Sequence, residues 1–348
     1  MNDILTAALL PDLPPTGRVL LAGAGGGYDV LGAVPLLLGL EAAGHTVHLG
    51  NLSFSNLDSL AKRCPQGVLQ HAPGLYELRS EAATEDLYCP EAWLARWLAK
   101  ASEKHASSRH SEGIAAVERP VPESERRLSA QVQVERSVWA WHKSGVRPMR
   151  AHFDALGERL GLDAIVLIDG GIDLILRGDE SSIGTPAEDL SSLAAARASC
   201  IPIRRVSCLG LGAELRDGIR HEQVFSRIAE LTRLGGYLGA SALVGASSVG
   251  RAYRDAVEFV FSHQQRHHLS HVHRVVLAAM AGEYGATAPH VWLSPLLNLY
   301  WHFELDTVAD SHLFLEHLAS TQTIGEVTLW IEGLRKGLRI QPQSVLPL

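Results

Sequence analysis

The stretch RVLLAGAGGGYDVLGAVPLLLGLEAAGHTVHLGNLS, residues 18–53, decides the fold class. Its apolar start predicts a strand, and the glycines at 23–27 predict a sharp turn. The apolar run that ends at Gly44 predicts a helix, and residues 46–53 alternate as a second strand. The stretch therefore predicts a strand-helix-strand unit of an α/β protein.

The same alternation continues further along the chain. AIVLIDGG, residues 164–171, is a short β-branched run bounded by glycines, which is typical of a buried central strand in a parallel sheet. The next helix is expected to start at Thr185 as N-cap, with Pro186 in its first position and Glu188 closing a capping box. Residues 203–214 predict another strand that runs into a glycine loop, and residues 222–236 another helix.

The remaining segments predict helices and one insertion. Residues 92–103 have helical spacing, residues 104–127 are polar and are expected to form an exposed insertion or lid, and residues 128–161 are interpreted as two helices packed through Trp139 and Trp141. From about residue 240 the chain is expected to be rich in helices. Residues 1–348 are thus predicted to form a single α/β domain.

Composition limits the partners. The chain of 348 residues is 46% apolar and carries a net charge of −7, so it has no overall attraction for nucleic acid or an anionic membrane surface. No stretch approaches the ~20 apolar residues that span a bilayer. The first residues lack a secretory leader pattern, so a cytoplasmic protein is expected. A homo-oligomer is left open.

The glycine turn is a candidate phosphate site. Backbone N–H groups of Gly25, Gly26 and Gly27, followed by a helix start at Asp29, would suit a phosphate, although a tight turn without a ligand is the alternative. Tyr28 stands where a dinucleotide fingerprint needs a small residue. No acid ends the second strand, and no Lys-Ser/Thr pair follows the glycines, so nicotinamide binding is disfavoured and a Walker-type loop is excluded.

The acidic loop behind the central strand carries the candidate catalytic residues. Carboxylates there would act as general base, polarise ribose hydroxyls or bind Mg²⁺, with Arg177 as a fork for phosphate or as an ion-pair partner. The catalytic candidates are Asp169, Asp173, Asp179 and Glu180, of which Asp169, Asp179 and Glu180 are the metal candidates. Polar segments after several strands are expected to share one crevice, with these further ligand-binding candidates: Asn51, Ser53, Gly170, Gly171, Gly184, Thr185 and Glu214.

The histidine-rich stretch HQQRHHLSHVH, residues 263–273, is interpreted as a solvated or interface face. His263, His267 and His271 share one face of a predicted helix, but the glutamate of a zincin motif is missing. His221, by contrast, follows a strand and is a candidate for the crevice.

Four segments, AGAGGGYDVLGAVPL, NLSFSNL, AIVLIDGGIDLILRGDE and GTPAEDLSSLAA, in that order and spacing, resemble the prokaryotic domain-of-unknown-function family 1152. The resemblance implies a Rossmann-like fold and no catalytic assignment. With the strand pattern, it predicts a doubly wound, mostly parallel Rossmann-like α/β sheet with helices on both faces and a helical C-terminal portion.

The expected function is an enzyme acting on a small phosphorylated sugar or nucleotide, either a hydrolase or a glycosyl or phosphosugar transferase. Carboxylates can stabilise an oxocarbenium-like sugar or activate water without a redox cofactor. The first alternative is a non-catalytic nucleotide or metabolite sensor that uses the same crevice. The second is a nicotinamide-dependent oxidoreductase.

Overall fold

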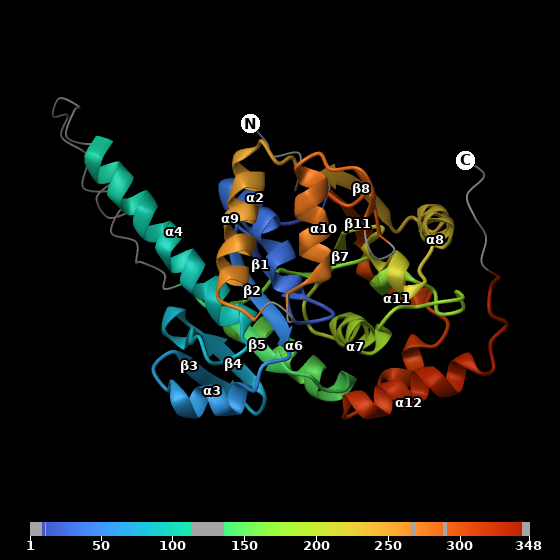
Figure 1. Ribbon diagram of the computed structural model, residues 1–348. Helices are drawn as coiled ribbons and strands as arrows, with labels where there is room; N and C mark the ends of the chain where they lie inside the picture. The colour runs from blue at the N-terminus through green and yellow to red at the C-terminus, as the bar shows by residue number, and fades with distance from the viewer. Residues whose placement is uncertain (1–8, 11, 113–135, 266–268, 288–290, 343–348) are drawn as a thin grey trace.

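A computed structural model describes residues 9–10, 12–112, 136–265, 269–287 and 291–342. Its centre is a nine-stranded sheet in the order β3-β4-β5-β2-β1-β6-β7-β11-β8 (Figure 1). The strands, in chain order, are β1 (Arg18–Gly23), β2 (Thr46–Ser53), β3 (Val68–Ala72), β4 (Leu75–Leu78), β5 (Val138–His142), β6 (Ala164–Asp169), β7 (Ile203–Leu209), β8 (Tyr237–Ala242) and β11 (Leu299–Glu304).

The five central strands, which lie in the order β5-β2-β1-β6-β7, are parallel to one another. Antiparallel strands flank them on both sides. This arrangement confirms the predicted α/β class and its parallel core. The antiparallel strand β11, which lies between β7 and β8, was not predicted, nor was β8 itself. The C-terminal portion therefore adds strands as well as helices to the body of the protein, among them the short pair β9 (Gly285–Thr287) and β10 (Val291–Leu293).

Helices cover both faces of the sheet because successive side chains of each central strand point to opposite faces. Leu21 and Ile168 pack in one core, while Leu20 and Leu167 pack in the other. The first face carries α2 (Val34–Ala42), α4 (Pro90–Glu112), α9 (Ser248–Ser262) and α10 (His271–Met280), and the second carries α6 (Val146–Leu160), α7 (Pro186–Arg197), α8 (His221–Arg233), α11 (Leu305–Asp310) and α12 (Ile324–Arg335) (Figure 1). α3 (Leu57–Arg63) contacts β3.

The prediction of two helices over residues 128–161 was wrong in its first half. Residues 138–142, VWAWH, form β5, in which Val138 and Ala140 face one core while Trp139 and Trp141 face the other. This period of two, in a β-branched and aromatic run, is the pattern of a strand buried on both faces. The second predicted helix is present as α6.

The predicted insertion at 104–127 has a different beginning. Residues 104–112 continue α4, which projects away from the sheet in Figure 1, and residues 113–127 lie outside the described residues. Among the helices that the structure describes, none has the length and apolar character needed to cross a membrane.

The order of the strands creates a switch point beside β1. The chain passes from β1 to β2 on one side and later returns to place β6 on the other side. In doubly wound sheets a crevice opens where the connections diverge in this way, at the carboxyl ends of the strands. The glycine turn after β1 and the acidic loop after β6 meet at this point, where the amide of Ala24 donates to the carbonyl of Ile168 at 2.9 Å.

Candidate functional site

The glycine turn after β1 encloses a carboxylate of the protein itself. Asp29 accepts a hydrogen bond from the amide of Gly25 at 2.8 Å, and the amides of Gly26 and Gly170 also donate to it. These N–H groups, expected to bind a phosphate, are therefore already bonded to an internal anion. The Asp29 carboxyl group thus occupies the anion-binding position of the turn in which a phosphate was expected.

Asn51 and Ser53 lie at the end of β2, beside the glycine turn. The Asn51 amide donates to the carbonyl of Gly27 at 2.9 Å and to Glu91 at 2.8 Å, and Ser53 Oγ accepts from the amide of Ser55 at 3.1 Å. Both side chains are buried, as is Glu91. The structure thus gives Asn51 and Ser53 bonds within the protein and not an open position in the crevice.

Three carboxylates converge above the turn: Asp29, Asp169 at the end of β6, and Asp189 in the first turn of α7. One oxygen of each lies within 4.8 Å of the others, and we call these three residues the inner triad. Asp169 accepts from the amide of Leu174 at 3.3 Å, whereas Oδ1 of Asp189 is buried without a hydrogen-bond partner. Only 4% of Asp189 is exposed.

A second group of carboxylates adjoins the triad. Asp173 and Glu214 are hydrogen-bonded to each other, which requires that one of them carries a proton. Asp173 also accepts from the amide of Thr185 at 3.2 Å, and Glu214 accepts from the amide of Ile172 at 2.7 Å. We call Asp173 and Glu214 the carboxyl pair.

The electrostatics of the triad and the pair favour protonation. Burial raises the pKa of all five carboxyl groups, and the neighbouring carboxylates raise it further. The pKa of Asp29 is raised to about 7. Burial is the largest cause for both members of the carboxyl pair, so the pair retains a proton that the two acids share. In the described part of the chain, the ion pairs of Lys, Arg and His involve other acids, such as Glu188 and Asp179.

Four glycines of the site leave room for carboxylates. A Cβ on Gly25 would lie 2.8 Å from Oδ1 of Asp189, and one on Gly171 would lie 2.7 Å from the Glu214 carboxyl group. A Cβ on Gly170 would clash with the Asp29 side chain, and a Cβ on Gly184 would clash with the Asp173 side chain. The glycines of this site are therefore needed for the space that they leave to acidic side chains.

Asp179 and Glu180, the other acidic candidates, face a different partner. Glu180 accepts from the amides of Arg177 and Gly178 at 2.7 and 2.8 Å, and the side chain of Gln341 donates to Asp179 at 3.0 Å. The structure does not bring them into the triad: both oxygens of Glu180 accept backbone amides, and Oδ1 of Asp179 accepts the Gln341 side chain. Arg177 lies between Asp179 and Glu230, 3.9 Å from each.

The predicted capping box at the start of α7 was wrong. Thr185 is the N-cap residue and Pro186 opens the helix, but the Thr185 side chain makes no capping hydrogen bond. Glu188 instead forms an ion pair with Lys143. The amide of Thr185, as described above, is bonded to Asp173, so Gly184 and Thr185 hold a carboxylate where a phosphate was expected.

The histidines are also arranged differently from the prediction. α9 ends at Ser262 with His263 as its C-cap, α10 begins at His271, and His267 lies outside the described residues. The prediction that these histidines share one helix face is therefore wrong. His221 does reach the site: with Ile172, Gly212 and Glu214 it lines a small hollow beside the carboxyl pair. Burial lowers the pKa of His221.

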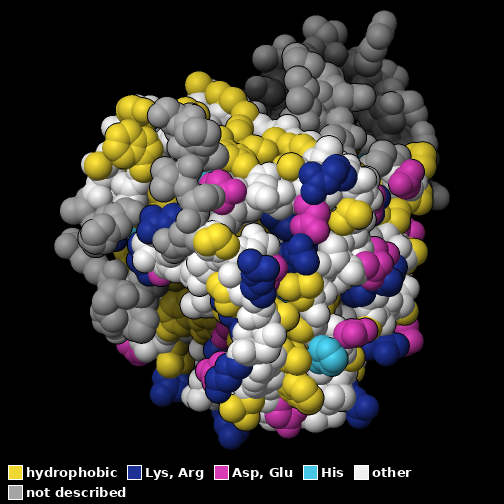
Figure 2. All heavy atoms as spheres, turned by 90° about the vertical axis from the view of Figure 1, so that its right-hand side faces the viewer, with side chains coloured by type: hydrophobic (Ala, Val, Ile, Leu, Met, Phe, Trp, Pro, Cys, Tyr) yellow, Lys and Arg dark blue, Asp and Glu magenta, His cyan; other side chains and the backbone are white. Residues whose placement is uncertain are grey.

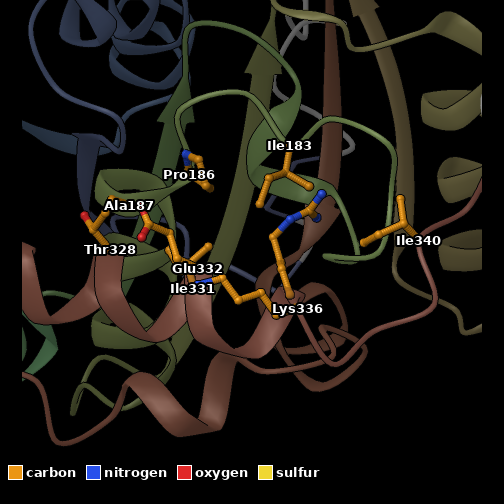
Figure 3. Close-up of a pocket in the computed structure, with 9 residues that line it drawn as sticks. Ile183, Pro186, Ala187, Thr328, Ile331, Glu332, Lys336 and Ile340 are labelled. Carbon is orange, nitrogen blue, oxygen red and sulfur yellow. The ribbon is translucent and has the colours of Figure 1, made fainter.

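A larger groove lies between α7 and α12. It has a volume of about 510 Å³ and is lined mainly by apolar side chains, including Ile183, Pro186 and Ile331 (Figure 3). None of the triad or the pair is among its lining residues. On the face of the molecule seen in Figure 2, acidic and basic side chains are interspersed, which is not the continuous basic stripe of a nucleic-acid interface.

The sequence analysis missed Asp189 and Glu91. Asp189 follows Glu188 in the first turn of α7, where acids are common for helix-dipole reasons alone, so its position carried no distinguishing signal. Glu91 opens α4, far in sequence from the turn that it supports.

Comparison with known proteins gives a family. The model of the DUF1152 family, described as a protein of unknown function, matches residues 99–332. The chain belongs to this family. The DUF1152 match includes Asp169, Asp173, Asp189 and Glu214, whereas the glycine turn and Asp29 lie before it. Searches of curated proteins and of solved structures found no match.

Proposed function

We propose that this DUF1152 protein is a hydrolase or transferase that acts on a phosphorylated sugar or nucleotide, bound at the switch point between β1 and β6. The observation that carries the proposal is the carboxyl pair. Asp173 and Glu214 share a hydrogen bond and adjoin three further carboxylates, and Glu214 lines a small hollow together with His221. Adjacent acids whose pKa values are pushed apart are the usual source of a general acid and a general base.

In this proposal the two members of the pair have opposite roles. Asp173 accepts the proton of the attacking water or hydroxyl group, and Glu214 donates its proton to the leaving oxygen. Their buried surroundings keep a proton available near neutral pH. Neighbouring carboxyl groups hold the hydroxyl groups of the sugar, because a carboxyl group accepts hydrogen bonds in either protonation state and also donates one when it is protonated.

The phosphate is best placed outside the carboxylates. The amides of the glycine turn are bonded to Asp29, and a bare phosphate beside five acids would be repelled. Arg220 lines the same hollow as Glu214 and His221. The hollow itself, with a volume of about 10 Å³, is too small for a phosphate, so we place the phosphate outside it, at the exposed Arg220 side chain, in place of the position at residues 25–29 expected from the sequence.

The test is turnover of a panel of phosphorylated sugars and nucleotides, followed by ³¹P NMR. We expect Glu214→Gln and Asp173→Asn to lower kcat by about 10²–10⁴, the usual contribution of acid–base catalysis, with ligand binding retained. Asp179→Asn, in the same loop, is the matched control and should keep the parent rate. Ligand binding without any product would favour the sensor alternative, and absence of both binding and product would contradict the proposal.

A further inference from the structure

Beyond the proposed reaction, we infer that the inner triad of Asp29, Asp169 and Asp189 is a binding site for one hard divalent cation, Mg²⁺ or Mn²⁺. The inference stands on the arrangement of the three carboxylates and does not depend on the substrate or on the reaction of the carboxyl pair.

The unpaired oxygen of Asp189 is the first reason. Oδ1 of Asp189 is buried, has no hydrogen-bond partner, and belongs to the residue whose carboxylate converges with those of Asp29 and Asp169. An unpaired carboxylate removed from water is costly and needs a counter-charge or a donor. Asp29 accepts three backbone amides and Asp169 accepts one, but N–H dipoles do not supply the full positive charge of a cation.

The second reason is that, within the described residues, no ion pair joins a basic side chain to an acid of the triad. Among the ion pairs of the described residues, the basic side chain near the start of α7, Lys143, is joined to Glu188 and not to the triad. The lateral approach to the triad is open to a small ion, since Gly25, Asp29 and Gly170 are partly exposed while Asp169 and Asp189 are buried. A cation that enters there would meet all three acids together.

The donor set selects the class of metal. Three carboxylate oxygens within 4.8 Å of one another are close to the span of one ion, since ligands on opposite sides of Mg²⁺ are about 4 Å apart at bond lengths of about 2.0–2.1 Å, and the acids would draw together by a fraction of an ångström on binding. Oxygen-only sets suit Mg²⁺, Mn²⁺ and Ca²⁺ better than Zn²⁺ or Cu²⁺, which prefer nitrogen or sulfur. Mg²⁺ keeps several of its waters, and the partly exposed side of the triad leaves room for them.

The experiment is a titration of the full-length, chelator-treated protein with Mn²⁺ at pH 8, with free Mn²⁺ measured by electron paramagnetic resonance. We expect one Mn²⁺ per chain, displaced by Mg²⁺. Asp189→Asn keeps the shape of the side chain and should weaken binding at least about tenfold, because it removes a charged ligand. Asp179→Asn is the control and should bind like the parent.

Two results would overturn the inference: no Mn²⁺ bound by the parent at millimolar concentration, or equal affinity in Asp189→Asn and the parent. Asp29→Asn gives a second reading if Asp189→Asn does not fold, and it too should bind at least about tenfold more weakly. The outcome is separate from the proposed function. Metal bound without turnover of any phosphorylated substrate would contradict the reaction and leave the metal site in place. Turnover by a parent protein that binds no Mn²⁺ would contradict the metal site and leave the reaction in place.

Discussion

The two ends of one acidic stretch, residues 169–180, have opposite surroundings. At its start, Asp169 and Asp173 face other carboxylates, and burial raises the pKa of both. At its end, Glu180 accepts two backbone amides and Asp179 accepts the side chain of Gln341. Within eleven positions the stretch passes from acids that face other carboxyl groups to acids that face amide donors.

The difference teaches that a cluster of acids is defined by the donors around it and not by its density in the sequence. The end of the stretch turns back on its own amides and on the C-terminal segment, and so holds the loop in place. The start of the stretch lies where β1 and β6 end and meets Asp29 and Asp189 from other elements. Repulsion among these acids costs stability, which is characteristic of sites kept for binding or catalysis.

The largest effect expected from this comparison is on the pH dependence of stability without metal. The pKa of Asp29 rises from 3.8 to about 7 on folding, so the folded state holds the proton more tightly than the unfolded state. The free energy of unfolding should therefore fall as the pH rises from about 4 to about 7, by up to about 4 kcal/mol for a shift of this size.

Thermal unfolding in chelator from pH 4 to 8 measures this slope. Buried histidines such as His302, whose pKa is lowered to about 4, act in the opposite sense below pH 6.5, so the comparison between variants is decisive. Asp29→Asn should flatten the slope and Asp179→Asn should leave it as in the parent. Equal slopes in all three proteins would contradict the electrostatic contrast between the two ends of the stretch.

The next effect tests the space that the glycines provide. Gly171→Ala places a Cβ 2.7 Å from the Glu214 carboxyl group and should destabilise the protein by about 2–3 kcal/mol, as overpacking does. Gly333→Ala is the control, because that position in α12 has no atom within 4 Å of the new Cβ, and it should be neutral or stabilising. Urea unfolding measures both, and a similar loss in both variants would argue against the interpretation.

A pair of charge-removing variants should change stability in opposite directions. Glu180→Gln keeps one acceptor oxygen and turns an NH₂ group toward the other of the two amides, so it should lower the free energy of unfolding by about 1–3 kcal/mol. Asp189→Asn replaces a buried acid, whose raised pKa makes folding cost free energy at pH 8, by a neutral amide of the same shape, and should raise the free energy of unfolding by about 1 kcal/mol at pH 8 in chelator. Denaturant unfolding of both variants under the same conditions measures these changes. A change of the same sign in both would contradict the distinction between the triad and the end of the acidic stretch.

The smallest effect concerns the attachment of the C-terminal segment. Gln341→Ala removes the bond from its side chain to Asp179 but keeps the bond from its backbone amide to the Asp179 carbonyl at 2.8 Å. We expect a loss of about 1 kcal/mol and no change in Mn²⁺ affinity. Lys336→Ala, a nearby exposed change, should stay within about 0.5 kcal/mol of the parent. A change in metal affinity on Gln341→Ala would link the two ends of the stretch.

Much of the fold could be predicted because it depends on local patterns. The apolar strand β6, the glycine turn and the alternation of strands with helices are all legible within short windows of sequence. β5 was missed because its tryptophans were interpreted as helix packing residues, and β11 because a short strand late in the chain pairs only with distant partners. Pairing of that kind is a tertiary property.

The site was predictable only in part, for the same reason. That Asp169 and Asp173 stand at the end of a buried strand follows from the sequence, as does a crevice beside the glycine turn. Which carboxylates face one another does not, since Asp29 and Asp189 join Asp169 only through the packing of α7 over the turn. Asp179 and Glu180 lie apart from the triad, and one of the hydrogen bonds that hold them there comes from Gln341, more than 150 residues away in the sequence.

The four glycines that leave room for carboxylates also constrain how this protein can be engineered. Gly25 with Asp189, and Gly171 with Glu214, behave as single mutational units, because an added methyl group at one position requires a shorter side chain at the other. A library that varies one position at a time will therefore record these sites as intolerant. Libraries that randomise both members of a pair together should recover folded variants with new ligand sets, which makes the pair the natural unit of redesign.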